Sequence, residues 1–299
     1  MKIAYIILAH KYPEQLVRLI RSIADDSTSF FIHFDKRSSD EMYNDLVKQL
    51  SSMSNVHLLK RFSCFWGNFN IVAATIEGIR QLVHSNIDFD YAILLSGQDY
   101  LIKPINQIKE FLEKHRGKEF IETFSLASQN KWTNQDGCYQ ALNRIQHWHF
   151  SFRSKHLYIP IKRRFPKGLE PYGGSQWWCL SRDCIQYIND FVVNNSGFVN
   201  YFKYVFIPDE TFFNTIVSNS PFKNYIVSDD LKYADWENPN PTPPAIICKN
   251  DFHKLANSPK LFARKFDMNR DVEILDLIDQ KILGFSTLIE PYISYKKCS

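Results

Sequence analysis

The sequence has no apolar segment long enough to cross a membrane, because a spanning helix needs about 18 or more apolar residues. The apolar run at the N-terminus, Ile3–Ala9, is much shorter, and no small-residue cleavage site of a signal peptide follows it. A run of this kind is typical of a buried first strand. We therefore expect a cytoplasmic protein, and peripheral attachment to the inner face of the cell membrane stays open.

Cysteine spacing and net charge argue against two further classes. The six cysteines form no C-x-x-C pair, and no histidine lies at zinc-finger spacing from a cysteine pair. Scattered cysteines in a chain of this size are more often reduced core residues than a disulfide set. The formal net charge of +4 is small and dispersed, so it gives no argument for nucleic-acid binding.

Aromatic residues, by contrast, are abundant, at 15% of the 299 residues. They can belong to an aromatic-rich core, or they can line a groove that stacks on flat ligand faces such as sugars or bases. The hydrophobic fraction of 44% and the charged fraction of 23% are those of an ordinary globular protein. The composition alone leaves both interpretations open.

Strand and helix patterns alternate through the first 120 residues. The apolar runs predict strands at 3–9, 30–34, 56–59 and 91–95. The intervening segments carry apolar residues at helical spacing, with helices beginning at Pro13 and Pro104 and a third over about 72–83. This order predicts an α/β fold with a mostly parallel sheet flanked by helices. We expect a single domain over 1–285, with a donor half at about 1–124, an acceptor half at about 125–285, and a tail at 286–299.

Three polar residues follow the predicted strands. His10, Asp35 and Asp99 each lie at or just after a strand end. Ligands of such sheets bind beyond the carboxyl ends of the strands, so these residues are candidates for a binding site. Taken one at a time, each could equally be a helix cap or a turn former.

Two segments lack a regular pattern. The segment 125–171 is polar and basic with interleaved aromatic residues, which predicts an irregular functional loop or lid, with nucleic-acid binding as the rival interpretation. The proline-rich tract 238–244 predicts an extended connector.

Two adjacent carboxylates precede a predicted helix at 212–217. They are Asp209 and Glu210 of Pro208-Asp209-Glu210. Both could cap the helix and compensate its dipole. Consecutive side chains diverge, so one could instead face a cleft while the other caps.

Bulky and basic pairs occur further along the chain. Trp177 and Trp178 are adjacent in a predicted strand, so they cannot share a face, and we expect at least one in the core and the other available to a cleft. Arg264 and Lys265 are either a solvated pair or, next to a cleft, partners of a diphosphate.

Together these residues resemble glycosyltransferase family 14, which contains the core-2 and I-branching N-acetylglucosaminyltransferases and the peptide xylosyltransferases. The resemblance extends from Ile3 to about Asp271, and the chain resembles a bacterial-type member. The matching segments, in the order typical of the family, are 3–10, 33–35, 66–67, 96–103, 174–178, 208–210, 231–236 and 261–267.

The resemblance implies a GT-A-type fold and an inverting transfer from a UDP-sugar to an acceptor hydroxyl, without a metal or other cofactor. Our best estimate of the donated sugar is N-acetylglucosamine, and we expect a glycan or lipid-linked glycan acceptor and no nucleic-acid partner. Inversion needs one base opposite the leaving group, and Glu210 is the candidate. The predicted donor-binding residues are His10, Asp35, Trp66, Asp99, Arg264 and Lys265, and the predicted acceptor-binding residues are Trp236, Trp177 and Trp178.

Some features stay open at this stage. The family's second diphosphate-binding arginine has no match, because the corresponding segment is 241–245, and Arg264 or Lys249 could replace it. One alternative function is a metal-dependent transferase that uses Asp88-Phe89-Asp90, although that segment precedes a strand instead of ending one; Asp229-Asp230 is the other acidic pair to consider. The second alternative is a non-catalytic carbohydrate- or nucleic-acid-binding protein on the same scaffold.

Overall fold

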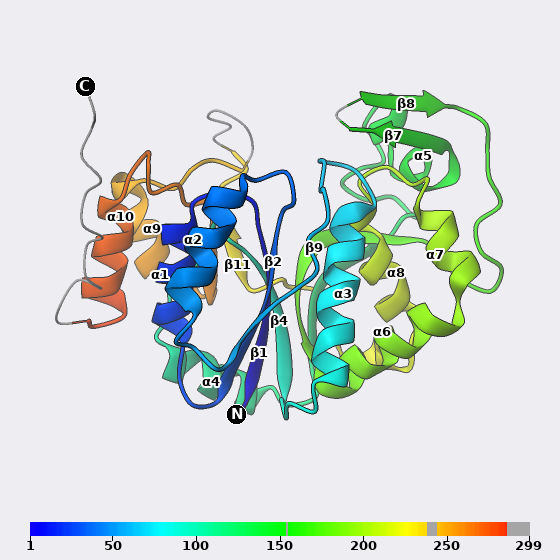
Figure 1. Cartoon of the computed structure of the whole chain (residues 1–299). Coiled ribbons are helices and arrows are strands. Elements are labelled where there is room, and N and C mark those ends of the chain that lie inside the picture. The colour runs from blue at the N-terminus through cyan, green and yellow to red at the C-terminus, as the bar shows by residue number, and fades with distance from the viewer. Residues whose placement is uncertain (154, 238–243, 286–299) are drawn as a thin grey trace, which may run out of the picture.

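A seven-stranded sheet forms the centre of the computed structural model, which describes residues 1–153, 155–237 and 244–285 (Figure 1). The strands, in their order across the sheet, are β10 (Ile226–Val227), β6 (Glu119–Ser125), β9 (Tyr172–Ser181), β4 (Tyr91–Ser96), β1 (Ile3–Ala9), β2 (Thr28–Phe34) and β3 (Val56–Leu58). All pairs are parallel except those of β9, which is antiparallel to both neighbours. The predicted α/β class with a mostly parallel sheet is confirmed.

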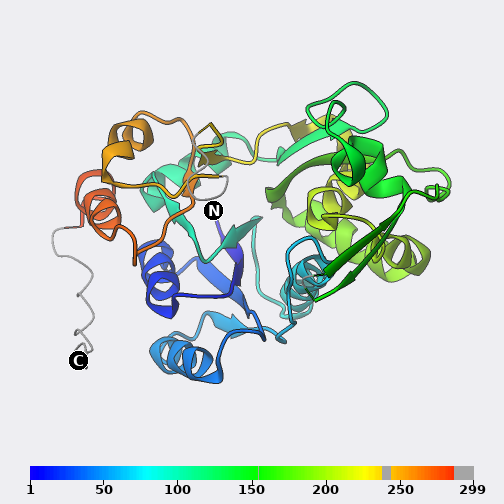
Figure 2. The same cartoon turned by 90° about the horizontal axis from the view of Figure 1, so that it is seen from above.

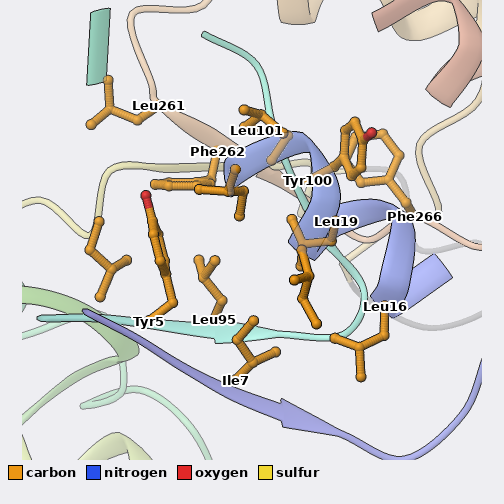
Figure 3. Close-up of a cluster of buried hydrophobic side chains, with 14 of the residues drawn as sticks. Tyr5, Ile7, Leu16, Leu19, Leu95, Tyr100, Leu101, Leu261, Phe262 and Phe266 are labelled. Carbon is orange, nitrogen blue, oxygen red and sulfur yellow. The ribbon is translucent and has the colours of Figure 1, made fainter. Parts of the chain in front are cut away.

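Helices cover both faces of this sheet, because alternate residues of β1 point into two different cores. Ile3, Tyr5 and Ile7 pack with one set of helices, and Ala4 and Ile6 pack with the other. Figure 3 shows Tyr5, Ile7 and Leu95 on the same side of the sheet as the first helix, with Phe262 and Leu101 across from them. The helices on the first face are α1 (Pro13–Ile23), α2 (Asp40–Leu50), α4 (Ile105–Lys114) and α10 (Glu273–Leu277), and those on the second are α3 (Asn70–His84), α6 (Arg182–Asn194), α7 (Ser196–Phe202) and α8 (Phe212–Ser218).

A second sheet of three short strands packs on the first face of the central sheet, because Tyr100, Leu101 and Phe262 belong to the same core as the first set of helices. Its strands are β11 (Lys232–Ala234), β12 (Phe262–Arg264) and β5 (Asp99–Leu101). β12 is antiparallel to β5, and this register places Arg264 opposite Asp99. The helix α9 (Phe252–Ala256) precedes β12. The sequence pattern does not predict this sheet, because each of its strands has only three residues.

The segment 125–171 is more regular than predicted. It contains the short helix α5 (Ala141–Gln146) and an antiparallel hairpin of β7 (Trp148–Phe152) and β8 (Lys155–Ile159), so the expectation of an irregular loop was wrong. Alternating apolar and polar residues in Trp148–Phe152 favour a strand, and this pattern was overlooked. Figures 1 and 2 show the hairpin on one side of the molecule and α9 and α10 on the other.

The remaining elements are short. They are 3₁₀ turns η1 (Gly137–Tyr139), η2 (Pro208–Glu210), η3 (Pro221–Tyr225) and η4 (Lys249–Asp251), and a π-helical turn η5 (Ile278–Ile282). Within the described residues, no helix is both long and apolar enough to span a bilayer. The predicted connector lies almost wholly outside the described residues, and so does the tail 286–299. The division at about residue 124 and the single domain over 1–285 stay predictions.

Candidate active site

Two adjacent cavities lie over the carboxyl ends of the strands. The smaller has a volume of about 330 Å³, and the larger has a volume of about 740 Å³. Gln176, Trp177 and Arg264 line both, so the two cavities are parts of one cleft. This is the edge of a parallel sheet at which ligands are expected to bind.

The smaller cavity contains three of the predicted donor-binding residues. His10 and Asp35 follow β1 and β2, and Trp66 faces them from the loop before α3. The Asp35 carboxylate accepts hydrogen bonds at Oδ1 from the backbone N–H of Arg37 (2.8 Å) and that of Cys64 (3.3 Å). Its Oδ2 has no hydrogen-bond partner among the described residues and can accept from a ligand N–H or hydroxyl. Trp66 is 68% exposed, and its ring is free to stack on a planar group.

The larger cavity contains Glu210 and Trp236. Glu210 ends the turn η2, and its side chain is 32% exposed. Burial raises the pKa of this carboxyl group, and the charge of Arg144 opposes the rise. A carboxylate with a raised pKa is a stronger proton acceptor, as a general base requires. Trp236 is 63% exposed in the same cavity.

Arg144 of α5 is a site residue that the sequence analysis missed. Its Nη1 donates to Glu210 Oε2 at 2.8 Å, and its side chain is only 5% exposed. The guanidinium lies 3.9 Å from the centre of the Trp132 ring and donates to Gln135 Oε1 and to the carbonyl of Tyr139. These contacts hold Arg144 in one position, so it can fix the orientation of the Glu210 carboxylate.

Asp209 does not cap the following helix. It is buried, its Oδ1 has no partner within the described part of the chain, and no side chain caps α8. Burial, and secondarily the charge of Glu210, raise the pKa of Asp209 to about 7. Of the two adjacent carboxylates, Glu210 is therefore the one that faces the cleft.

A buried charge network lies beneath the junction of the two cavities. Asp99 is fully buried, and its carboxylate accepts hydrogen bonds from Lys232 Nζ (2.5 Å), Arg264 Nε (3.2 Å) and both the N–H and the hydroxyl of Ser96. The predicted contact of Asp99 with the UDP-sugar is therefore corrected. Hydrogen bonds from Lys232, Arg264 and Ser96 already occupy its carboxylate oxygens. Asp99 instead fixes Arg264, which does line the cleft.

Lys232, which the sequence analysis also missed, is enclosed by this network. Its Nζ lies 3.8 Å from the centre of the Trp177 ring, and the Arg264 guanidinium lies 4.6 Å from that ring. Burial lowers the pKa of Lys232 to about 8, although the charge of Asp99 opposes this shift. The indole of Trp177 thus lies against both cations, which also share the carboxylate of Asp99.

Lys265 adjoins the smaller cavity but lines neither. Burial and the charges of Arg264 and Lys11 lower its pKa, and its own charge affects His10. Lys265 forms no salt bridge with any residue that the structure describes, so its charge is available to an anion. Lys249, by contrast, is paired with Glu273 at 2.6 Å on the surface and lines neither cavity, whereas Arg264 lines both.

The two adjacent tryptophans of β9 have different roles. Trp177 lines both cavities, whereas Trp178 is fully buried against Phe213. The predicted acceptor contact of Trp178 is therefore wrong, because strand alternation turns its side chain into the core. Gly174 lies in the same strand, β9. A Cβ there would lie 1.9 Å from the carbonyl oxygen of Glu122, which explains the glycine.

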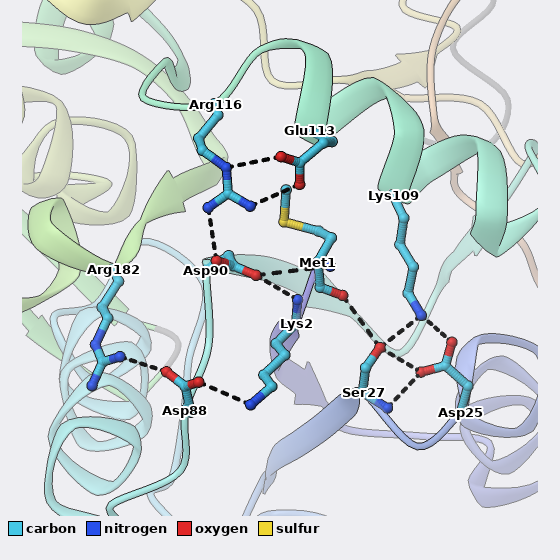
Figure 4. A network of polar contacts seen from close by, with 10 residues as sticks. All are labelled: Met1, Lys2, Asp25, Ser27, Asp88, Asp90, Lys109, Glu113, Arg116 and Arg182. Carbon is cyan, nitrogen blue, oxygen red and sulfur yellow. Dashed lines mark hydrogen bonds and ion pairs between the residues drawn. The ribbon is translucent and has the colours of Figure 1, made fainter.

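The acidic segment Asp88-Phe89-Asp90 lies at the opposite edge of the sheet, before β4 begins (Figure 4). Asp88 pairs with Lys2 and Arg182, and Asp90 pairs with Arg116. This placement removes the segment from the cleft. Asp229 and Asp230 do line the larger cavity; Asp229 pairs with Lys260, and Asp230 accepts from Ser175. Over the described ranges, no three side chains of His, Cys, Asp or Glu form a metal-binding group.

Comparisons with known proteins identify relatives. The family model described as Core-2/I-Branching enzyme matches residues 3–256. Xylosyltransferase 1 of Rattus norvegicus is 26% identical over 311 aligned residues, which cover 95% of this chain and 36% of that protein. Xylosyltransferase of Ciona intestinalis is also 26% identical, with coverages of 95% and 34%. The chain therefore spans about a third of the length of these curated relatives. A solved structure of the galactosyltransferase LgtC with donor and acceptor sugar analogues matches with a TM-score of 0.44 and 11% identity, over 96% of this chain and 98% of that one.

Proposed function

Because this chain belongs to the Core-2/I-branching enzyme family, we propose that it is an inverting glycosyltransferase that moves a sugar from a UDP-sugar to a hydroxyl of a glycan acceptor. The observation that carries this proposal is the single cleft with two functional ends. Three of the predicted donor-binding residues, His10, Asp35 and Trp66, line one cavity. The candidate base lines the other, and Arg264 lines both.

Glu210 is the proposed general base. An inverting transfer needs a base on the side of the sugar opposite the leaving group, where it accepts the proton of the attacking hydroxyl. A donor bound across the junction, with its nucleotide in the smaller cavity, would expose its sugar to the larger one. The acceptor hydroxyl would then lie between the sugar and Glu210, and Arg144 would hold the carboxylate toward it.

Arg264 and Lys265 are the proposed partners of the leaving diphosphate. Negative charge grows on UDP as the bond to the sugar breaks, and fixed cations stabilise that charge. Arg264 is held in place by Asp99 and has no second carboxylate partner within the described residues. We propose that these cations suffice without a divalent metal. The rate should then be largely unchanged in EDTA, whereas complete loss with recovery on adding Mn²⁺ would favour the metal-dependent alternative.

Trp236 and Trp177 are the proposed acceptor contacts. Both line the larger cavity, and their indole rings can pack on the apolar face of a sugar. The cavity volume of about 740 Å³ is sufficient for a ligand larger than a monosaccharide. A glycan, free or linked to a lipid, is the acceptor class that this cavity fits best.

N-acetylglucosamine is the proposed donor sugar, and xylose is the second candidate because the relatives named above are xylosyltransferases. The two can be separated by a thermal-shift screen with UDP-N-acetylglucosamine, UDP-xylose and UDP-glucuronic acid. A bound ligand stabilises the folded state by about 2.7 kcal/mol at a concentration of about one hundred times its Kd. The cognate donor should give the largest shift.

The substitution Glu210→Gln tests the central step. It keeps the shape of the side chain and removes the base, so kcat should fall by about 10²–10⁴ while UDP-sugar affinity stays near that of the parent. Glu122→Gln is the matched control, because it removes a carboxylate charge from the same cavity and should retain most of kcat. Activity of Glu210→Gln within a few-fold of the parent would exclude Glu210 as the base. UDP-sugar binding by the parent without turnover on any acceptor would favour the non-catalytic alternative.

A further inference from the structure

The hairpin of β7 and β8 has two faces of different character. Cross-strand pairs place His149 opposite Tyr158 on one face and Phe150 opposite Leu157 on the other. The first face packs against the body of the protein, since the ring of His149 stacks on Phe206 at 5.4 Å. Figure 1 shows the hairpin at one side of the molecule. The second face contacts Tyr204 through Trp148 and Phe150, and it exposes Phe152 and Leu157 to solvent. We refer to it as the outer face.

The outer face is apolar and exposed. Phe152 is 73% exposed, Leu157 is 58% exposed, and Phe150 is 40% exposed. Ile161, just after β8, is 62% exposed. Large apolar side chains grouped on one exposed face mark an interaction surface more often than solitary ones do. A partner that covers this face must therefore be apolar where it meets these side chains.

The charged side chains near these apolar residues in the sequence are all positive. The sequence between Asp136 and Glu170 contains no Asp or Glu. Arg153 and Lys155 lie at the tip of the hairpin, and Lys162 and Arg164 follow β8; all four are exposed. None of the four forms a salt bridge with a residue that the structure describes, so their charges are available to a partner. A partner that covers the outer face should therefore carry negative charge next to the apolar surface that meets these side chains.

We propose that the outer face of the hairpin binds the surface of an anionic lipid bilayer. Phe150, Phe152 and Leu157 would enter the boundary between headgroups and acyl chains, and Lys155 and Arg153 would meet the headgroup phosphates. Aromatic side chains on an element with flanking cations are the combination that favours this interface.

Other occupants fit the same face less well. Single-stranded nucleic acid stacks on aromatic rings, but Leu157 and Ile161 offer no stacking surface and gain from contact with hydrocarbon. A second copy of this chain would bring like charges together around the apolar centre, which opposes association. A bilayer supplies both the hydrocarbon and the negative charge.

The hairpin is connected to the smaller cavity of the cleft through one aromatic side chain, Phe206. Phe206, which supports the inner face, also contacts Trp66, and Trp66 lines the smaller cavity. A bilayer on the outer face would therefore lie close to the cleft and to any acceptor carried by a lipid. This consequence rests on the proposed function, whereas the lipid binding itself does not.

Cosedimentation with vesicles tests the proposal. We expect the protein to sediment with vesicles of equal parts phosphatidylcholine and phosphatidylglycerol, and to remain in the supernatant with phosphatidylcholine alone. The variant Phe152→Ser, Leu157→Ser should weaken binding at least tenfold, at about 0.8 kcal/mol for each CH₂ withdrawn from the bilayer. The variant Lys155→Gln, Lys162→Gln should weaken it about fivefold for each cation removed.

Matched controls separate the face from general effects. Val193→Ser removes an equally exposed apolar side chain elsewhere, and Lys48→Gln removes an exposed cation; both should bind vesicles as the parent does. Thermal unfolding and UDP affinity should be the same in all variants, so a failure of the proposed function would be seen separately. The proposal is overturned if the parent ignores anionic vesicles, if the hairpin variants bind as the controls do, or if an oligonucleotide binds the outer face more tightly than the vesicles.

Discussion

Replacing Arg144 by methionine should move the acidic limb of the pH–rate profile to higher pH. Methionine retains an apolar chain over Trp132 but removes the guanidinium that donates to Glu210 at 2.8 Å. Glu210 acts as a base only when it is deprotonated. In the parent, burial raises the pKa of Glu210 and the charge of Arg144 lowers it. Without Arg144 the largest effect that opposes burial is lost, and only the weaker effect of Lys131 still opposes it, so the pKa of Glu210 rises further.

The size of the shift can be derived from the contact. A hydrogen bond to a charged group contributes about 1.5–3 kcal/mol, and one pKa unit corresponds to about 1.4 kcal/mol. With 5% of the Arg144 side chain exposed, solvent screens the pair weakly. We therefore expect the limb to move up by about one to two pH units. At high pH, where Glu210 is deprotonated in both proteins, kcat of Arg144→Met should be closer to that of the parent than it is at low pH. A carboxylate with a higher pKa is also the stronger base.

The assay is kcat measured over a range of pH with saturating donor and acceptor. Arg144→Lys keeps a positive charge and should restore part of the shift. Lys131→Met removes another cation from the same cavity. Lys131 is half exposed and pairs with Glu122, so the acidic limb of this variant should move less than that of Arg144→Met. An unchanged limb in Arg144→Met, with a folded protein by thermal unfolding, would refute the role given to Arg144. A uniform loss at every pH would instead show that Arg144 acts through the fold of its loop.

Three other substitutions test the remaining features. Lys265→Ala should weaken UDP binding by about 1.5–3 kcal/mol in calorimetry, because it removes a charge-assisted contact with the diphosphate; unchanged affinity would make Lys265 a surface cation. Trp236→Ala should raise the KM of the acceptor more than that of the donor, and a defect confined to donor binding would contradict its placement. Asp209→Asn should stabilise the protein above pH 7. The raised pKa of about 7 means that the folded state holds a proton that the unfolded state has lost, so ionisation of Asp209 costs stability above that pH. The advantage, about 2–4 kcal/mol in thermal or denaturant unfolding, should shrink as the pH falls and vanish below about 4, the unfolded pKa; an advantage independent of pH would contradict the raised pKa.

The central sheet could be predicted because its strands are continuous apolar runs. Ile3–Ala9 is buried on both faces, and such a run has one stable place, at the centre of a parallel sheet. His10 and Asp35 could be assigned to the cleft for the same reason, since each follows a strand whose carboxyl end lies at that edge. Burial and strand direction are encoded locally, within a few residues.

The second sheet and the residues that it positions could not be predicted in this way. β5, β11 and β12 have only three residues each, which is too short for a period to be recognised. Asp99 was therefore placed at a ligand site, although the pairing of β5 with β12 buries it. Arg144 lies 66 residues from its partner Glu210, and nothing in the local pattern distinguishes it from neighbouring cations.

If the cleft binds a diphosphate as proposed, the buried network fixes the position of Arg264, the cation that would contact it. Asp99 forms ion pairs with two cations, Lys232 and Arg264, and the charge of Asp230 also acts on Lys232. Arg264 therefore shares its one carboxylate partner among the described residues with Lys232. The lowered pKa of Lys232 reflects the cost of burying a second cation there. Arg264 uses Nε for Asp99, which fixes the plane of the guanidinium at the junction of the two cavities. A diphosphate at this point would give Arg264 a second anionic partner, and a rigid cation that is already in place loses little conformational entropy when it binds.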